Sequence, residues 1–177
     1  LQPQSAAELR AVFASLRDRA DALAALPLPD LLAPLERLGA MWAPGTPRYA
    51  RACELLAGVF SQQSVERALR SLSLSMRADL LADALQRELG RAHLLDRWEP
   101  DALGIGFVKG YPLGVVAQVL AGNVFLGGVV AIAQSLLTRN PVVLKLSRED
   151  SGFTALFAES LRTADPSGAV ANAVALC

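Results

Sequence analysis

Polar side chains follow two predicted strands of this sequence, at the point where each strand ends. The apolar run Val115–Leu120 leads into a turn that contains Asn123, and the apolar run 141–146 contains Lys145 and is followed by Ser147. A crossover helix between parallel strands brings their carboxyl ends to the same edge of a sheet. Open α/β sheets bind nucleotides at that edge. The pattern therefore predicts a nucleotide site where the two strands end.

The second half of the sequence alternates strand and helix patterns. The expected strands are 103–108, 115–120, 141–146 and 170–176, and the expected helices lie between the last three of them. Asp150 or Ser151 is a suitable cap for a helix from about Gly152 to Thr163. This order predicts a βαβαβ unit with a parallel sheet, which is Rossmann-like, although the glycine-rich loop GxGxxG is absent.

The first half reads as a series of helices separated by prolines. The expected helices are 5–25, 31–41, 49–60 and 64–89, with Thr46 as a cap before the third and Gly90 ending the fourth. The stripe of leucines from Ser64 to Leu89 predicts one long helix. We therefore expect a helical region at residues 1–99 and a partial dinucleotide-binding domain at residues 100–177.

Composition excludes several classes of function. The 177 residues are 53% apolar, and 17 basic residues balance 17 acidic ones, so no nucleic-acid partner is expected. The single histidine, His93, and the widely separated Cys53 and Cys177 form no metal-ligand spacing, so no metal site is expected. Two distant cysteines without a secretory leader pattern are typical of a cytoplasmic protein.

The uncharged stretch from Val115 to Leu137 raises one alternative. It is long enough to cross a bilayer as a helix, which would make this a membrane-associated helical protein. Glycines and the polar residues Gln118, Asn123 and Gln134 interrupt the stretch. They favour a strand, a turn and a buried helix, so no membrane span is expected.

Three ordered motifs with matching gaps point to a known family. They are Pro112-Leu113-Gly114-Val115-Val116, Leu120-Ala121-Gly122-Asn123-Val124 and Val142-Val143-Leu144-Lys145-Leu146-Ser147. In order and spacing these motifs resemble the nucleotide-binding segment of the aldehyde dehydrogenase superfamily. The residues of the second motif and the helical N-terminal region are most similar to those of the LuxC-type acyl-CoA reductases.

This resemblance implies a cysteine-dependent reductase. Such an enzyme takes an acyl group from a CoA or acyl-carrier-protein thioester onto a cysteine and reduces it with NADPH to an aldehyde. The chemistry needs a thiolate, hydrogen-bond donors for the oxyanion and a nucleotide site. The family's nucleophile lies downstream of residue 177, so the sequence is expected to stop partway through the nucleotide-binding domain.

The resemblance also assigns roles to individual residues. Asn123 matches the asparagine that donates to the oxyanion, and its alternative role is that of a turn residue with positive φ. Lys145 matches the lysine that contacts the adenosine ribose, with Ser147 close by, and its alternative role is a solvent-exposed lysine at a strand end. Val119 and Leu120 would supply backbone and apolar contacts along the cofactor.

Arg148 bears on the choice of cofactor. It occupies a position where many superfamily members carry a glutamate that binds the ribose hydroxyls, and an arginine there suits a 2′-phosphate. We therefore expect NADP as the cofactor, with NAD as the alternative. Phe125 and Leu146 replace prolines that are common in the superfamily, which puts the fine geometry of the site in question.

The two cysteines and the possible partners complete the expectations from the sequence. Cys177 is read as a buried residue of the third strand, and Cys53 as a small buried residue of a helix. The missing nucleophile leaves open a noncatalytic α/β interaction module that keeps the fold without the chemistry. Possible partners are a second copy of the chain or acyl-transfer subunits.

Overall fold

The computed structural model describes residues 5–91, 93–148, 150 and 152–177. Its first part contains five helices: α1 (Ala6–Ala25), α2 (Leu28–Met41), α3 (Pro47–Leu56), α4 (Gln62–Ser75) and α5 (Ala78–Leu89). Polar caps start three of them, because Ser5, Thr46 and Ser61 each accept a hydrogen bond from a backbone N–H of the first turn. Gly90 ends α5 with a φ of 75°, as the sequence predicts.

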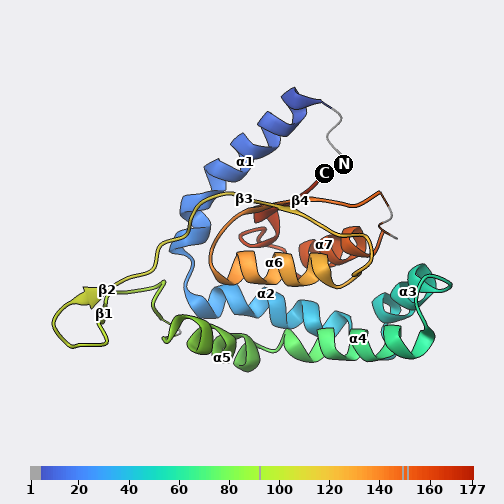
Figure 1. Cartoon of the computed structure of the whole chain (residues 1–177), viewed down its shortest axis with the longest axis horizontal. Helices are drawn as coiled ribbons and strands as arrows, with labels where there is room; N and C mark the ends of the chain where they lie inside the picture. The colour runs from blue at the N-terminus through green and yellow to red at the C-terminus, as the bar shows by residue number, and fades with distance from the viewer. Residues whose placement is uncertain (1–4, 92, 149, 151) are drawn as a thin grey trace.

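The prediction of one helix from Ser64 to Leu89 is wrong. The chain leaves helical geometry at Met76 and Arg77, where Arg77 has a ψ of 137°, and α5 then begins. Both helices pack against α2 (Figure 1), so the break lets each apolar stripe face the same helix. At the break, a Cβ on Gly39 of α2 would lie only 2.6 Å from the Cβ of Met76. The glycine therefore permits this close approach.

The second part forms the predicted βαβαβ unit. Its strands are β3 (Val116–Val119), β4 (Val142–Lys145) and β5 (Val174–Leu176), and they form a parallel sheet in the order β3-β4-β5. Helices α6 (Gly127–Leu137) and α7 (Phe153–Ala164) make the two crossovers. The fold class expected from the sequence, a helical region followed by a small parallel sheet with crossover helices, is confirmed.

Three predicted strands differ in detail. Residues 171–173 of the expected last strand form a 3-10 helix, and only the two residues Phe107–Val108 (β2) of the expected strand 103–108 are extended. They pair with Glu99–Pro100 (β1) in an arm that projects from the body (Figure 1). The strand expected to be buried, β3, lies at an edge of the sheet, and the side chain of Val119 is 79% exposed.

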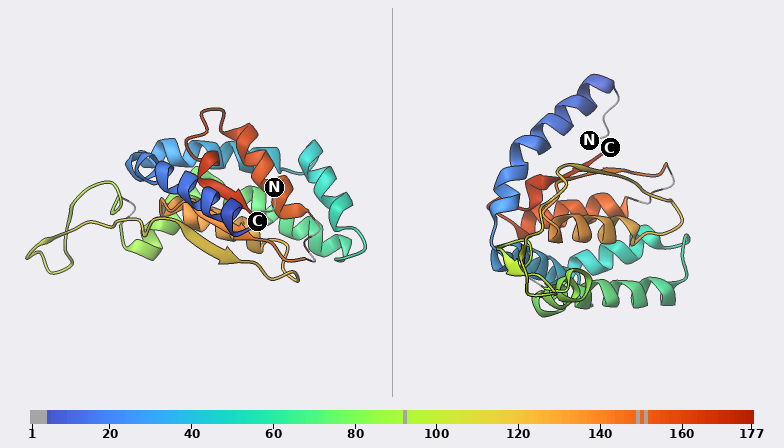
Figure 2. Two further views of the ribbon diagram at one scale, coloured as in Figure 1. Left: turned by 90° about the horizontal axis from the view of Figure 1, so that it is seen from above. Right: turned by 60° about the vertical axis from the view of Figure 1, so that its left-hand side comes forward.

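The structure is layered on one side of the sheet. Helices α6 and α7 cover one face, α2 lies behind them, and α4 and α5 lie outermost (Figures 1 and 2), whereas α1 runs beside the 3-10 helix before β5. Trp42, at the end of α2, is fully buried, and its ring centroid lies 5.2 Å from that of Phe153 and 5.7 Å from that of Phe157. One core thus joins the helical region to the sheet. The domain boundary near Glu99 stays a prediction.

The uncharged stretch from Val115 to Leu137 is divided between β3, a turn and α6. Within the described part of the chain, no helix has both the length and the apolar character needed to span a bilayer. The alternative of a membrane helix in this stretch is therefore wrong.

The close contact between α6 and α7 generates one prediction. A Cβ on Gly128 would lie 2.5 Å from Cγ2 of Thr154, whereas a Cβ on the neighbouring Gly127 meets nothing closer than 3.9 Å. Gly128→Ala should lower the free energy of unfolding by about 1–3 kcal/mol because the helices must separate. The matched Gly127→Ala should leave it unchanged or raise it by up to about 1 kcal/mol. Urea denaturation measures both, and equal effects would contradict the packing described.

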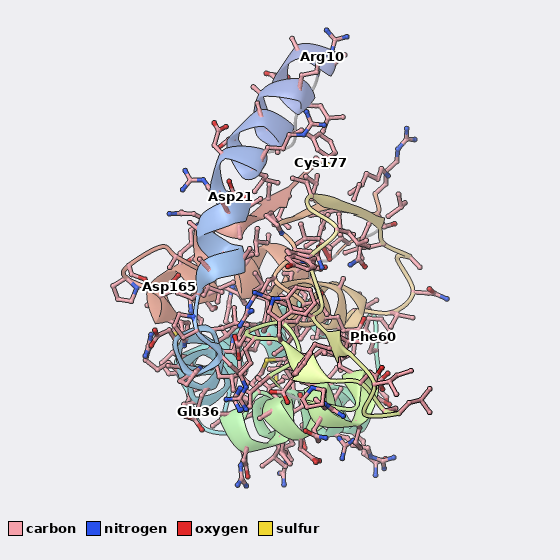
Figure 3. The ribbon with its side chains drawn as sticks, turned by 90° about the vertical axis from the view of Figure 1, so that its left-hand side faces the viewer. Arg10, Asp21, Glu36, Phe60, Asp165 and Cys177 are labelled. Atoms are coloured by element: carbon pink, nitrogen blue, oxygen red, sulfur yellow. The ribbon has the colours of Figure 1, made fainter. Side chains whose placement is uncertain are left out.

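Asp165 supports a second prediction, since it shapes the connection from α7 to β5 (Figure 3). The buried carboxylate accepts the hydroxyl of Ser167 and the N–H groups of Val170 and Ala171, at 2.7 and 2.8 Å for the two amides. Burial raises the pKa of Asp165, but these hydrogen bonds outweigh it, so the net pKa lies below the usual value. The carboxylate therefore stabilises the fold at neutral pH.

Asp165→Asn should lower the free energy of unfolding at pH 7 by about 1–3 kcal/mol. A lowered pKa in the folded chain means that the stabilisation is complete above the unfolded pKa of about 3.9 and disappears as the pH falls through the folded pKa. The difference between the wild-type and variant chains should thus be largest above about pH 5 and shrink below about pH 4. A pH-independent difference in urea denaturation would show that the charge has no role.

Candidate functional site

The carboxyl ends of β3 and β4 meet as the sequence predicts. Val119 stands opposite Lys145 in the parallel ladder, and the N–H of Leu120 donates to the carbonyl of Lys145 at 3.0 Å. After this pair, β3 continues into the turn that carries Asn123, and β4 continues toward Ser147. The structure therefore brings the two predicted groups of residues to one edge of the sheet.

The two faces of the sheet differ at this edge. Val142 and Leu144 of β4 belong to the core beneath the helices, so the alternation of side chains along a strand places Val143 and Lys145 on the opposite face. Val119 shares that face with Lys145, because the two residues are paired. Both side chains are exposed. An apolar surface and a cation thus lie side by side on the face that α6 and α7 leave open.

Asn123 lies in a turn between β3 and α6 and is exposed. Arg139 is the one described non-glycine residue with a positive φ, so the alternative in which Asn123 serves as a turn residue with positive φ is wrong. Its side-chain amide makes no hydrogen bond within the part of the chain that the structure describes. The amide is therefore available to donate to a ligand.

Phe125 explains one departure from the family pattern. Its ring centroid lies 5.0 Å from that of Phe60 and 5.2 Å from that of Phe153. Proline holds a turn by restricting φ, whereas this aromatic contact holds the same turn through packing. The segment after Asn123 is thereby attached to the core.

A small pocket lies behind the turn. It is lined by residues from the segment between α3 and α4, from the β3–α6 turn, from the segment after β4 and from the start of α7, including Phe60, Gly122, Ser147 and Thr154. Its cavity volume is about 20 Å³, which is enough for about one water or hydroxyl group. A nucleotide base or nicotinamide ring does not fit inside, so a dinucleotide would have to lie along the exposed sheet edge.

Asp150 also lines this pocket, and the sequence indicated only its capping role. The N–H groups of Gly152 and Thr154 and the Thr154 hydroxyl lie near its carboxylate and act to lower its pKa. It lies beside the start of α7, but the residue at the N-cap position is Gly152, with a φ of 86°. Ser151, the other expected cap, lies outside the described residues. Burial outweighs these neighbours and raises the pKa of Asp150.

Ser147 and Arg148 follow β4. Ser147 is half-buried and lines the pocket, whereas Arg148 is exposed and has no ion pair with any described residue. The structure therefore places Ser147 beside the turn of Asn123 and leaves the guanidinium of Arg148 in solvent near the same edge. A phosphate group approaching this edge would meet the cations of both Lys145 and Arg148.

Cys53 is not placed as an activated nucleophile, and Cys177 lies outside the strands. Cys53 is half-buried in α3, and burial together with the nearby Glu66 raises the pKa of its thiol. A raised pKa disfavours the reactive thiolate. Cys177 follows β5 (Figure 3), where its N–H donates to Leu144 and its carbonyl accepts from Leu146. It is half-buried rather than fully buried.

The chain is similar in sequence to acyl thioester reductases. The model of a family described as acyl-CoA reductase (LuxC) matches residues 23–177. The long-chain acyl-protein thioester reductase of Vibrio harveyi is 33% identical over 96 residues, which are 54% of this chain and 20% of that protein. The protein of the same description from Aliivibrio fischeri is 44% identical over 75 residues, 42% of this chain and 15% of that protein. The chain thus spans a fifth or less of these relatives.

Two solved structures share the fold. Glyceraldehyde-3-phosphate dehydrogenase GapN from Methanocaldococcus jannaschii, complexed with NADP, matches 99% of this chain and 37% of its own, with a TM-score of 0.76 and 14% identity. Proline utilization A (PutA) from Bradyrhizobium japonicum matches 99% of this chain and 17% of its own, with a TM-score of 0.76 and 18% identity. These matches establish an aldehyde dehydrogenase-like fold.

Proposed function

The chain belongs to the LuxC family of acyl-CoA reductases, and we propose that it forms the cofactor-binding part of an NADPH-dependent reductase of fatty acyl thioesters. The observation that carries this proposal is the meeting of the Asn123 turn and Lys145 at one sheet edge. Residues 100–177 would contribute the partial cofactor-binding domain, and the helices of residues 1–99 would support it from behind. The acyl donor would be an acyl-CoA or an acyl carrier protein.

The proposed reaction has two stages. A cysteine thiolate, supplied from outside residues 1–177, attacks the thioester carbonyl, and the CoA or carrier thiol leaves as the acyl group moves to the enzyme. NADPH, if held by the residues at the sheet edge, would supply the hydride that reduces the acyl carbon. The bond from that carbon to the cysteine sulfur then breaks, which releases the aldehyde and returns the thiolate. Each turnover thus consumes one NADPH and one proton and releases one free thiol.

Asn123 would act on the oxyanion in both stages. Negative charge develops on the carbonyl oxygen when the thiolate attacks and again when the hydride arrives. The exposed side-chain amide of Asn123, with no internal partner among the described residues, can donate to that oxygen. The packing of Phe125 against Phe60 and Phe153 supports this role, because it restrains the turn before a ligand binds.

The residues at the sheet edge suit the cofactor in charge and shape. Val119 and Leu120 would contact its apolar surfaces, Lys145 and Ser147 would bind the adenosine ribose, and Arg148 would pair with the 2′-phosphate. The solved NADP complex with the same fold supports this choice. These residues would hold and orient the bound cofactor.

Cofactor titration of the chain tests this part of the proposal. Lys145→Ala should weaken NADPH and NADH together, whereas Arg148→Ala should weaken NADPH by about tenfold or more and leave NADH nearly unchanged, because only NADPH carries the 2′-phosphate. Isothermal titration measures the dissociation constants, and circular dichroism checks the fold. Both side chains are exposed, so neither change should alter stability by more than about 0.5 kcal/mol.

The result also separates the two candidate functions. Saturable NADPH binding that depends on Lys145 would support the reductase. Equal affinity of the wild-type chain for NADPH and NADH would contradict the preference for NADP that Arg148 predicts. A folded chain that binds neither nucleotide would reject this proposal and favour the noncatalytic interaction module.

An apolar groove beside α6 is the proposed site for the acyl chain. It has a volume of about 440 Å³ and runs between α6 and the helices α4 and α5, and its lining includes Leu72, Met76, Val129 and Val130. The groove begins at Leu126, three residues after Asn123. The description of the relatives as long-chain reductases supports this occupant. A thioester carbonyl near Asn123 could thus place its acyl chain along α6.

Val130→Trp tests the groove. Val130 is 49% exposed, so the larger indole can fill the groove without entering the core. Each methylene displaced from apolar contact costs about 0.8 kcal/mol, so the loss of two should weaken a long-chain acyl-CoA by about tenfold. Acetyl-CoA should bind as before. Ala14→Trp, on the exposed surface of α1, is the control, and an equal loss in both variants would contradict the assignment.

A further inference from the structure

The groove beside α6 continues into a second groove, which we call the distal groove. The distal groove has a volume of about 350 Å³, and its lining includes Leu85 of α5 and Thr138 after α6. Ala84, Gln134 and Leu137 line this groove and also the first one. Because three residues are shared, the two grooves form one continuous path.

The path has a direction relative to the Asn123 turn. The first groove begins at Leu126, three residues after Asn123. On α5 the first groove starts at Leu80 and the distal groove ends at Leu89, and on the α6 side the path ends at Thr138. It therefore runs from the turn toward the C-terminal ends of both helices. A helix rises about 1.5 Å per residue, so the path along α6 is about 18 Å long.

The distal groove suits a hydrocarbon chain rather than a charged group. Its buried lining residues are Leu85 and Leu137, and Leu89 beside them is half-buried. The exposed Glu88 lies at the rim, where it would repel an anionic group such as a phosphate. The occupant would thus be the apolar end of a ligand whose polar end lies elsewhere.

Ala84 and Gln134 flank the passage between the two grooves, since one belongs to α5 and the other to α6 and both line each groove. Ala84 is half-buried, and its side chain is a single methyl group. Gln134 is exposed. A larger side chain at either position would narrow the passage without entering the core.

We propose that the distal groove holds the far end of a long acyl chain and that Ala84 and Gln134 determine which chain lengths are accepted. The inference rests on the proposed function and defines the substrate class of its acyl site. An octanoyl chain with its carbonyl at Asn123 would end within the first groove, whereas a palmitoyl chain is long enough to pass Ala84. Each further methylene that is buried should raise the affinity about fourfold.

Titration with acyl-CoA of two lengths tests the inference. Ala84→Phe should weaken palmitoyl-CoA by about tenfold or more, because the ring excludes at least two methylenes from the distal groove. The same variant should bind octanoyl-CoA as the wild-type chain does. Isothermal titration measures both dissociation constants, with palmitoyl-CoA kept below the concentration at which it forms micelles.

Three further variants serve as comparisons. Gln134→Trp narrows the passage from the α6 side and should reproduce the pattern of Ala84→Phe, also if that variant does not fold. Val130→Trp should weaken octanoyl-CoA and palmitoyl-CoA alike, because Val130 lines only the first groove. Ala14→Phe, on the exposed surface of α1, should change neither. Circular dichroism and NADPH affinity check the fold of each variant.

The outcomes separate this inference from the proposed function. A wild-type chain that binds octanoyl-CoA and palmitoyl-CoA equally would overturn the role of the distal groove and leave the first groove standing. An equal loss of both ligands in Ala84→Phe and Gln134→Trp would also overturn it. A chain that binds NADPH but no acyl-CoA would overturn both groove assignments and leave the cofactor site standing.

Discussion

The packing of α2 against the backs of α6 and α7 is the contact on which the rest of the structure depends. A parallel sheet of three short strands buries little apolar surface by itself, so its crossover helices need a second layer behind them. Trp42 supplies the centre of that layer against Phe153 and Phe157. The Nε of Arg37 adds a hydrogen bond of 2.7 Å to the carbonyl of Ala164, at the end of α7. The helical region thus completes the core of the sheet.

At the other end of the sheet, a cluster of polar residues holds the segments that lead into β3 and β4. Arg139 is buried with a φ of 59° and donates to the carbonyl of Leu95 and to the carboxylate of Asp96. The side-chain oxygen of Asn140 accepts the N–H of Leu113 at 2.7 Å and of Gly114 at 3.2 Å. These contacts attach the segment before β3 to the start of β4. Buried polar groups therefore set the register from which both strands run toward the site.

Some residues of the site are held in place by packing and by the strand ladder, whereas others have polar atoms without a hydrogen-bond partner among the described residues. The aromatic contacts of Phe125 restrain the turn, and the ladder between β3 and β4 restrains Lys145. In contrast, the Asn123 amide lacks an internal partner among the described residues, and Oδ2 of Asp150 is buried without one. An exposed group that the fold leaves unsatisfied can make its hydrogen bonds to a ligand, so a rigid frame with an unpaired donor suits recognition.

The sequence by itself determined the βαβαβ order, the meeting of Leu120 with Lys145 and the cap residues Thr46 and Gly90, because these depend on local patterns and on the handedness of parallel crossovers. Only the tertiary structure decided the break at Met76, the exposure of Val119 and the unpaired oxygen of Asp150. The sequence did not reveal the break at Met76, because α4 and α5 both pack against α2 and their apolar residues therefore keep one continuous spacing. Exposure depends on whether a strand lies at the edge of its sheet, and hydrogen-bond satisfaction depends on neighbours that are distant in the sequence.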